Sequence, residues 1–271
     1  MKIRSVAIAV ASMLSQAVVA AEPVWQDNWP RFQAEEVGIT GSLIGTTILF
    51  TALSPDPMER WRGPILLDKP VRNLLHVRKT PARNTADTVS DVMLWSLVAW
   101  PLTDGAVAAV QPNGLDAGGQ MALISLQSLT ISTFGKQVVS DFAGRRRPYG
   151  DGCDDDPDYI HNCGTPDINR SFYSGHTALA VTGAALVCVQ HTNVEIYGGA
   201  ADQVACVTAA VAAGTVGALR IVADRHYFSD VFVGGALGLG SGLLLPRLMH
   251  YRSGPAPTSG SAPTVRIRIP L

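Results

Sequence analysis

Hydrophobic and small residues fill several long stretches of the chain, and shorter polar segments separate them. None of these stretches shows the sustained alternation of apolar and polar residues that a half-buried strand requires, and their lengths suit helices. The pattern therefore predicts an all-α fold. The predicted helices cover residues 38–53, 88–111, 118–142, 175–190, 203–222 and 230–249.

The first residues have the pattern of a secretory signal peptide. Lys2 and Arg4 precede an uncharged stretch that runs from Ser5 to Ala21 and ends in small residues suited to cleavage. A buried first helix is the alternative. The chain then divides into a signal peptide (1–21), a lead-in segment (22–37), one domain (38–250) and a flexible tail rich in Gly, Pro and Ser (251–271).

Composition limits the classes of function. The 271 residues are 47% hydrophobic and only 16% charged, where about 25% is usual, and the formal net charge is -1. A near-neutral chain gives no indication of a nucleic-acid partner. The low content of charged residues fits either a well-buried helical domain or a membrane-associated one. The composition does not indicate the oligomeric state. A membrane span needs ~20 mostly apolar residues, and the uncharged cores of the predicted helices are shorter.

Export makes disulfide bonds possible, and the cysteines form two neighbouring pairs. Cys153 and Cys163 flank one polar loop and Cys188 and Cys206 flank another, so each pair can close its own loop. Four buried free thiols are the alternative. A bridged first loop favours the exported side, whereas the basic segment at 54–85 favours the cytoplasm. We expect a periplasmic-side site in the cell envelope, on a protein that is soluble or integral to the inner membrane.

Three segments at the ends of predicted helices carry the candidate chemistry. The first, GRRRPYG, places Arg145, Arg146 and Arg147 at the end of the third helix. Guanidinium groups are planar forks that suit phosphate oxygens. A solvated basic turn is the alternative, so this segment alone indicates little.

The second segment, RSFYSGHTALA, begins a helix. Ser174 can cap that helix, and Gly175 allows an anion to approach the free amides of the first turn. His176 lies in the same turn, where a lone histidine is more often structural than catalytic. The segment predicts an anion site with a titratable neighbour.

The third segment is LRIVADRHYFSD. His226 and Asp230 are four residues apart, which puts them on one face of a helix. A carboxylate bonded to one imidazole nitrogen fixes the tautomer and frees the other nitrogen to react. Arg220 precedes His226 by six residues and adds a second source of guanidinium. A capped helix start without chemistry is the alternative.

In this order, the three segments resemble the motifs of the type 2 phosphatidic acid phosphatase and vanadium haloperoxidase superfamily. The family pattern is Lys, six residues, Arg-Pro; then Pro-Ser-Gly-His; then Ser-Arg, five residues, His, three residues, Asp. The resemblance covers residues 38–250 and implies a six-helix core and metal-independent hydrolysis of phosphomonoesters. The matching residues are Arg147 with Pro148, Ser174 with Gly175 and His176, and Arg220 with His226 and Asp230.

The resemblance also implies a role for each residue. His226 is expected to be the nucleophile, oriented by Asp230, and His176 the general acid that protonates the leaving oxygen. No metal or other cofactor is implied, and the expected substrate is a phosphorylated lipid, isoprenoid or small molecule. The phosphate oxygens are expected to contact Arg147, Ser174, the amide of Gly175 and Arg220.

Three positions depart from the family pattern. Tyr173 and Leu219 replace a proline and a serine that flank the motifs. Ser140 stands where the family has its lysine, whose charge would neutralise phosphate. The candidate replacements for that charge are Lys136, one turn earlier in the helix, Arg145, which we include among the phosphate-binding candidates, and Arg146.

Two other functions use the same residues. In a vanadium-dependent haloperoxidase, His226 would ligate vanadium, but the chain has little sequence for a separate halide pocket. The missing lysine motivates the second alternative, a decayed site that binds phospholipid head groups. The acidic run at 154–158 lacks the spaced ligands of a calcium loop, so a solvated loop is expected there.

Overall fold

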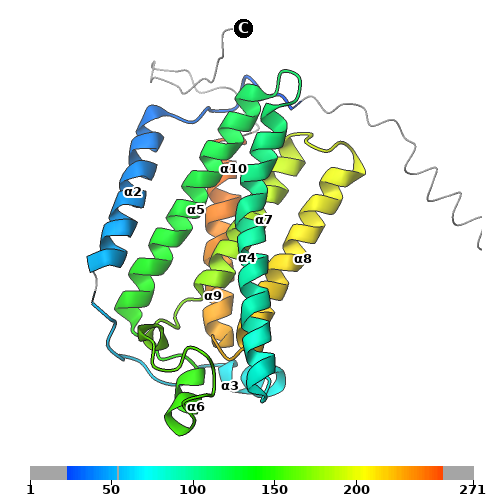
Figure 1. The fold of residues 1–271 in the computed structure, drawn as a ribbon. Coiled ribbons are helices and arrows are strands. Elements are labelled where there is room, and N and C mark those ends of the chain that lie inside the picture. The colour runs from blue at the N-terminus through cyan, green and yellow to red at the C-terminus, as the bar shows by residue number, and fades with distance from the viewer. Residues whose placement is uncertain (1–22, 54, 253–271) are drawn as a thin grey trace, which may run out of the picture.

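The computed structural model describes residues 23–53 and 55–252, so the predicted signal peptide and most of the predicted tail lie outside the described residues. Each predicted helix is found, the described part of the chain forms no β-strand, and an isolated β-bridge joins Trp61 and Arg145. The all-α prediction is confirmed (Figure 1). The long helices are α2 (Ala34–Leu53), α4 (Thr80–Ala109), α5 (Leu115–Ala143), α7 (Gly175–Asn193), α8 (Ala200–Val222) and α9 (Phe228–Leu239), which continues through the π-helical η2 (Gly240–Leu244) into α10 (Leu245–Met249).

Short elements that the sequence did not predict gather at one end of the bundle, which we call the loop end (Figure 1). They are α3 (Asp68–Leu75), α6 (Tyr149–Asp155) and the 3₁₀ helix η1 (Pro166–Asn169). In addition, α4 begins at Thr80, eight residues before its predicted start at 88, with a proline in its first turn, where the missing N–H has no helical partner to lose. The polar composition of residues 54–85 explains why α3 and the early start of α4 were not predicted.

The helix α7 packs against α4, α5, α8 and α9 and forms the centre of the bundle. Gly234, Gly238 and Gly242 lie four residues apart along α9 and η2. A Cβ added at any of them would come within 2.4–2.5 Å of a backbone carbonyl oxygen of α7 or of its N-cap residue. Small residues at this spacing let two helix backbones approach closely. By contrast, α2 packs against α5 at the edge and is mostly exposed, so the predicted six-helix core is not confirmed.

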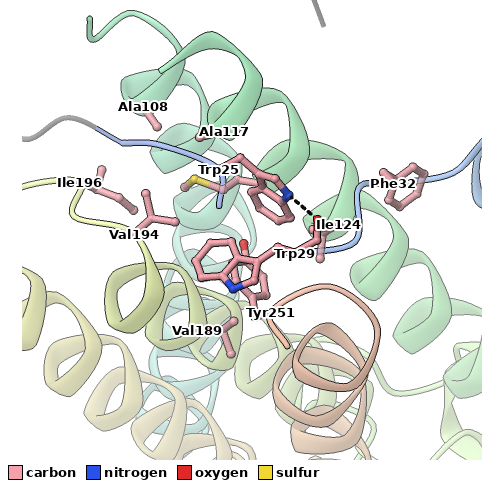
Figure 2. Close-up of a cluster of buried hydrophobic side chains, with 11 residues drawn as sticks. Trp25, Trp29, Phe32, Ala108, Ala117, Ile124, Val189, Val194, Ile196 and Tyr251 are labelled. Atoms are coloured by element: carbon pink, nitrogen blue, oxygen red, sulfur yellow. Dashed lines mark hydrogen bonds between the residues drawn. The ribbon is translucent and has the colours of Figure 1, made fainter. Parts of the chain in front are cut away.

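Aromatic side chains from both ends of the described chain close the other end of the bundle, which we call the far end (Figure 2). Trp25 and Trp29 come from the lead-in segment and Tyr251 follows α10, and their ring centroids lie 5.2–5.3 Å apart. Apolar residues of α4, α5, α7 and the following loop complete this cluster. The lead-in segment is therefore packed into the same core.

Both predicted cysteine pairs are bridged, with Cα–Cα distances of 5.6 Å for Cys153–Cys163 and 4.4 Å for Cys188–Cys206. The first bridge closes the segment after α6 at the loop end. The second joins α7 to α8, and Cys188 lies 13 residues beyond Gly175, or about 20 Å along the helix axis. The two bridges therefore lie toward opposite ends of the bundle.

Four helical stretches are long and apolar enough to cross a membrane: α2, α4, α8 and the continuous stretch Phe228–Met249. This finding corrects the expectation that the uncharged cores are too short. These lengths and compositions are compatible with membrane association.

Candidate active site

The loop end brings together the three segments that the sequence singled out. The helix α5 ends at Ala143, and Gly144 caps it in the left-handed conformation with a φ of 54°. The three arginines therefore follow the helix, which corrects the prediction that they finish it. In an irregular segment, successive side chains need not share a face, and these three have separate environments.

His226 is the buried centre of the site. Its Nδ1 lies 2.8 Å from the carbonyl oxygen of Ser171, and because a carbonyl only accepts, Nδ1 carries the proton. The lone pair of Nε2 faces Nη1 of Arg147 at 3.2 Å. Burial, followed by the charges of Arg147 and Arg220, lowers the pKa of His226 well below 6.5. The imidazole is therefore neutral at pH 7, with its lone pair on Nε2.

Asp230 acts on His226 through an intermediate residue. Its Oδ2 is 3.8 Å from Nδ1 of His226, beyond hydrogen-bonding distance. Asp230 instead accepts from the Ser171 hydroxyl at 2.6 Å and from the amide of Tyr227 at 2.9 Å. A direct carboxylate–imidazole bond, as the spacing suggested, is thus replaced by a relay in which Asp230 fixes Ser171 and the Ser171 carbonyl fixes the ring.

Arg147 and Arg220 supply guanidinium groups beside His226. Nε of Arg147 donates to the carbonyl oxygen of Asp167 at 2.8 Å. Nη1 of Arg220 donates to Asp87 at 2.6 Å, whereas its Nε is buried without a partner among the described residues. A buried unpaired donor calls for an acceptor, and the oxygens of a bound anion can satisfy it.

The N-terminus of α7 completes the anion site. The hydroxyl of Ser174 caps the helix, accepting from the amide of Thr177 at 3.4 Å and sharing a hydrogen bond with the Thr177 hydroxyl at 2.9 Å. The amides of Gly175 and His176 belong to the first turn, where helices have no internal acceptors and attract anions. The structure thus gives the Ser174 hydroxyl a capping role and leaves these amides for the anion.

His176 has a carboxylate partner on α4. Its Nε2 lies 2.8 Å from Oδ1 of Asp91, a residue that the sequence did not single out. Burial, together with the charge of Arg220, lowers the pKa of His176 to about 4, although Asp91 opposes this shift. His176 is therefore neutral at pH 7 while no anion is bound beside it.

Lys136, one of the candidate replacements for the family lysine, lies beside the N-terminus of α7. Its stem lies over Gly175, because a Cβ added to that glycine would come within 2.8 Å of Cγ of Lys136. Burial and the nearby charge of Arg147 lower the pKa of Lys136. Ser140 is fully buried, and its hydroxyl donates to the carbonyl oxygen of Gln137. Lys136 thus lies against the first turn of α7, one helical turn before Ser140.

The other two candidate replacements are engaged elsewhere. Arg145 is fully buried, with Nη1 paired to Asp230 at 2.5 Å and Nη2 paired to Asp68 at 2.7 Å. Arg146 pairs with Asp154 at 2.6 Å, in the acidic run that was considered for calcium. The prediction that Arg145 contacts phosphate does not fit this geometry, because both of its terminal nitrogens are occupied.

Several residues that build the site were missed by the sequence analysis. Asp87 and Asp91, which hold Arg220 and His176, lie at the start of α4. The sequence did contain a signal for them. Asp87 directly precedes the predicted apolar helix at 88–111 and Asp91 lies within it, and an unpaired charge in such a helix is costly. Among the described residues, no group of three or more His, Cys, Asp or Glu side chains is arranged to hold a metal ion.

The chain is similar to a known protein family. The family model described as PAP2 superfamily matches residues 121–253, a stretch that contains His176, His226 and every predicted phosphate-binding residue. No curated protein and no solved structure matches the chain. Asp87 and Asp91 lie outside the matched stretch.

Proposed function

Because the chain belongs to the type 2 phosphatidic acid phosphatase (PAP2) superfamily, whose members are generally phosphatases, we propose that it hydrolyses phosphomonoesters through a phosphohistidine on His226. One observation carries the proposal: a buried, neutral His226 presents the lone pair of Nε2 to a guanidinium group. A nucleophile needs that lone pair, and the transferred phosphoryl group needs the surrounding cations.

In the first step, Nε2 of His226 attacks phosphorus and the bond from phosphorus to the ester oxygen breaks. His176 donates a proton to that oxygen, so the leaving group departs as an alcohol. The pKa of His176 is about 4 in the free site, and the negative charge of a bound phosphomonoester favours its protonated form. Arg147, Lys136 and the first-turn amides of α7 stabilise the charge on the transferring oxygens.

In the second step, the now neutral His176 takes a proton from water while the water oxygen attacks phosphorus. The bond from phosphorus to Nε2 breaks, and inorganic phosphate leaves. The proton on Nδ1 stays on the ring throughout, held by the Ser171 carbonyl. The phosphorylated ring is therefore an imidazolium, which is a good leaving group for this step.

The cation at Lys136 also bears on the alternative of a decayed site. That alternative rested on Ser140, which leaves the family lysine position without charge. The stem of Lys136 on Gly175 and its proximity to Arg147 supply a cation from the preceding turn. The geometry thus favours a working phosphatase over a head-group binding protein.

We also propose that the protein is exported, with both ends of the bundle on the periplasmic side. Disulfides persist in oxidising compartments, and the bridges Cys153–Cys163 and Cys188–Cys206 lie toward opposite ends of the bundle. Helices that crossed the inner membrane would turn one of those ends toward the reducing cytoplasm. Alkylation of unreduced protein from cells is expected to label no cysteine, and a free thiol at Cys188 would contradict this topology.

The test of the proposed activity is phosphate release from an aryl phosphate by the purified full-length protein in EDTA. We expect turnover that persists without divalent metal and is inhibited by vanadate, because a cradle of cations and amides suits a trigonal-bipyramidal oxyanion. Rapid quenching with a ³²P-labelled substrate is expected to trap an acid-labile label that is absent in His226→Ala. Turnover that continues in His226→Ala would remove the phosphohistidine from the mechanism.

A further inference from the structure

A carboxylate lies at the edge of the proposed phosphate cradle. Oδ2 of Asp167, in η1, is 3.7 Å from Nη2 of Arg147, and Oδ1 is 3.9 Å from Nη1 of Arg170. These distances exceed those of hydrogen bonds, and the side chain is 47% exposed. The carboxylate therefore faces the cations without being fixed by them.

The backbone holds Asp167 in that place. Its carbonyl oxygen accepts from Nε of Arg147 at 2.8 Å, and the amide of Arg147 donates to the carbonyl oxygen of Ile168 at 2.7 Å. Arg147 is thus shared: its Nη1 faces His226 and its Nη2 faces the Asp167 carboxylate. Any anion bound by this guanidinium lies close to a second negative charge.

Asp167 is ionised at neutral pH. Burial opposes its charge, but the nearby cations Arg147, Lys136 and Arg170 outweigh burial and lower its pKa. Two of these three, Arg147 and Lys136, are the groups proposed to stabilise the transferring phosphoryl oxygens. The Asp167 carboxylate therefore partly neutralises the same positive charges that are proposed to stabilise the substrate's phosphoryl group.

We propose that Asp167 selects substrates by the charge of the leaving group, admitting monoesters of neutral or cationic alcohols and disfavouring leaving groups that carry negative charge, such as the phosphate of a diphosphate. This inference rests on the proposed phosphatase activity. The phosphoryl group itself is compensated by the cradle, whereas extra negative charge beside Arg147 meets the half-exposed carboxylate of Asp167. Like charges a few ångströms apart at a half-exposed site repel enough to change kcat/KM by about tenfold.

The experiment compares kcat/KM for 4-nitrophenyl phosphate and for inorganic pyrophosphate with the full-length protein. Asp167→Asn is expected to raise kcat/KM for pyrophosphate about tenfold relative to the aryl phosphate value, mainly through a lower KM, since a charge beside Arg147 acts on substrate binding. Asp167→Glu keeps the charge and is expected to keep the wild-type ratio. Asp158→Asn is the matched control, because it removes the same charge from an exposed position on the Cys153–Cys163 loop.

The possible outcomes distinguish charge selection by Asp167 from the proposed phosphatase activity. An equal change for both substrates in Asp167→Asn, no gain of pyrophosphate hydrolysis, or the same ratio change in Asp158→Asn would overturn charge selection by Asp167 while leaving the phosphatase in place. A wild-type protein that hydrolyses neither substrate and binds no inorganic phosphate in calorimetry would overturn the proposed function as well. A selective gain confined to Asp167→Asn supports both.

Discussion

Two buried histidines, at opposite ends of the bundle, have opposite surroundings. His226 at the loop end lies among cations, and burial together with Arg147 and Arg220 lowers its pKa. His191, near the far end of α7, bonds Asp202 through Nδ1 at 2.5 Å and Asp104 through Nε2 at 3.1 Å. Burial opposes its charge, but the two carboxylates outweigh burial and raise its pKa.

The difference shows that the charges around a buried histidine decide whether it has a structural or a chemical role. Both ring nitrogens of His191 face carboxylates, so the ring is an imidazolium that joins α4, α7 and α8, with no lone pair left for chemistry. His226 keeps a lone pair because a carbonyl oxygen accepts from one nitrogen and a cation faces the other. A buried histidine between carboxylates stabilises the fold, and one between a carbonyl and arginines is set up to react.

The largest expected effect is on turnover at the loop end. His226→Ala is expected to lower kcat by about 10⁴ because it removes the nucleophile. The unfolding free energy is expected to change by no more than about 2 kcal/mol, since the ring makes few polar contacts that other groups depend on. Steady-state kinetics and urea unfolding of the same preparation measure both. A collapse of stability with turnover retained would give His226 the structural role that we assign to His191.

The mirror experiment is His191→Leu. It leaves Asp104 and Asp202 buried without their cation and is expected to lower the unfolding free energy by about 3–5 kcal/mol. Turnover below the unfolding transition is expected to stay near wild type, since the change lies about 20 Å from the site along α7. Loss of turnover without loss of stability would contradict the comparison.

The pH dependence of this stabilisation has a definite sign. Because the folded-state pKa of His191 is raised, its contribution is complete below the unfolded-state value of about 6.5 and is lost as pH rises through the folded-state pKa. His191→Leu is therefore expected to cost most at acidic pH and least at alkaline pH. Urea unfolding at a series of pH values measures this trend.

The third effect concerns the cation that the sequence left undecided. Lys136→Met keeps the stem that lies over Gly175 and removes only the charge, so kcat/KM is expected to fall by about 10²–10³. Arg146→Met removes a neighbouring cation that pairs with Asp154, and we expect it to change kcat/KM less than about threefold. Equal losses in the two variants would mean that general positive charge, and not Lys136, supports the phosphoryl group.

The sequence predicted features that depend on local pattern, and it did not predict tertiary partners. Apolar content and length predicted the long helices, and motif spacing predicted His176, His226 and Arg220, because both depend on near neighbours in the chain. The partners of those residues depend on tertiary contacts: Asp91 is 85 residues from His176 and Asp87 is 133 residues from Arg220.

Local backbone shape explains the remaining errors. Three consecutive arginines look equivalent in sequence. Because α5 ends at Ala143, they lie on irregular backbone, where Arg145 is buried against Asp230 and Arg147 faces His226. Likewise, His226 and Asp230 have the spacing of a bonded pair on a helix. Because α9 begins at Phe228, His226 lies before the helix and bonds the Ser171 carbonyl instead.

A smaller effect is expected at the acid. Asp91 opposes the downward shift of the His176 pKa from burial and Arg220, so Asp91→Asn is expected to lower that pKa below about 4. Activity that needs protonated His176 falls as pH rises, and in Asp91→Asn this fall is expected at a lower pH than in the wild type. The pH profile of kcat/KM measures the shift, and the loss at any one pH should be smaller than the ~10²–10⁴ that removal of a general acid costs. An unmoved basic limb would show that Asp91 does not control His176.

The smallest effect is expected at Ser140, although its departure from the family pattern is the most conspicuous. Its hydroxyl donates to the Gln137 carbonyl inside α5 and it is fully buried, while Lys136 supplies the charge from one turn earlier. Ser140→Ala is therefore expected to leave kcat/KM within about threefold of wild type and stability within about 1 kcal/mol.

Ser140→Lys restores the family residue in sequence but forces a long charged side chain into a packed position, at a cost of about 1–3 kcal/mol or more. We expect it to lower the unfolding free energy without raising kcat/KM, and to leave Lys136→Met unrescued. Rescue of Lys136→Met by Ser140→Lys would instead show that the two positions reach one charge site, and that the bundle can open enough at Ser140 to admit the family lysine.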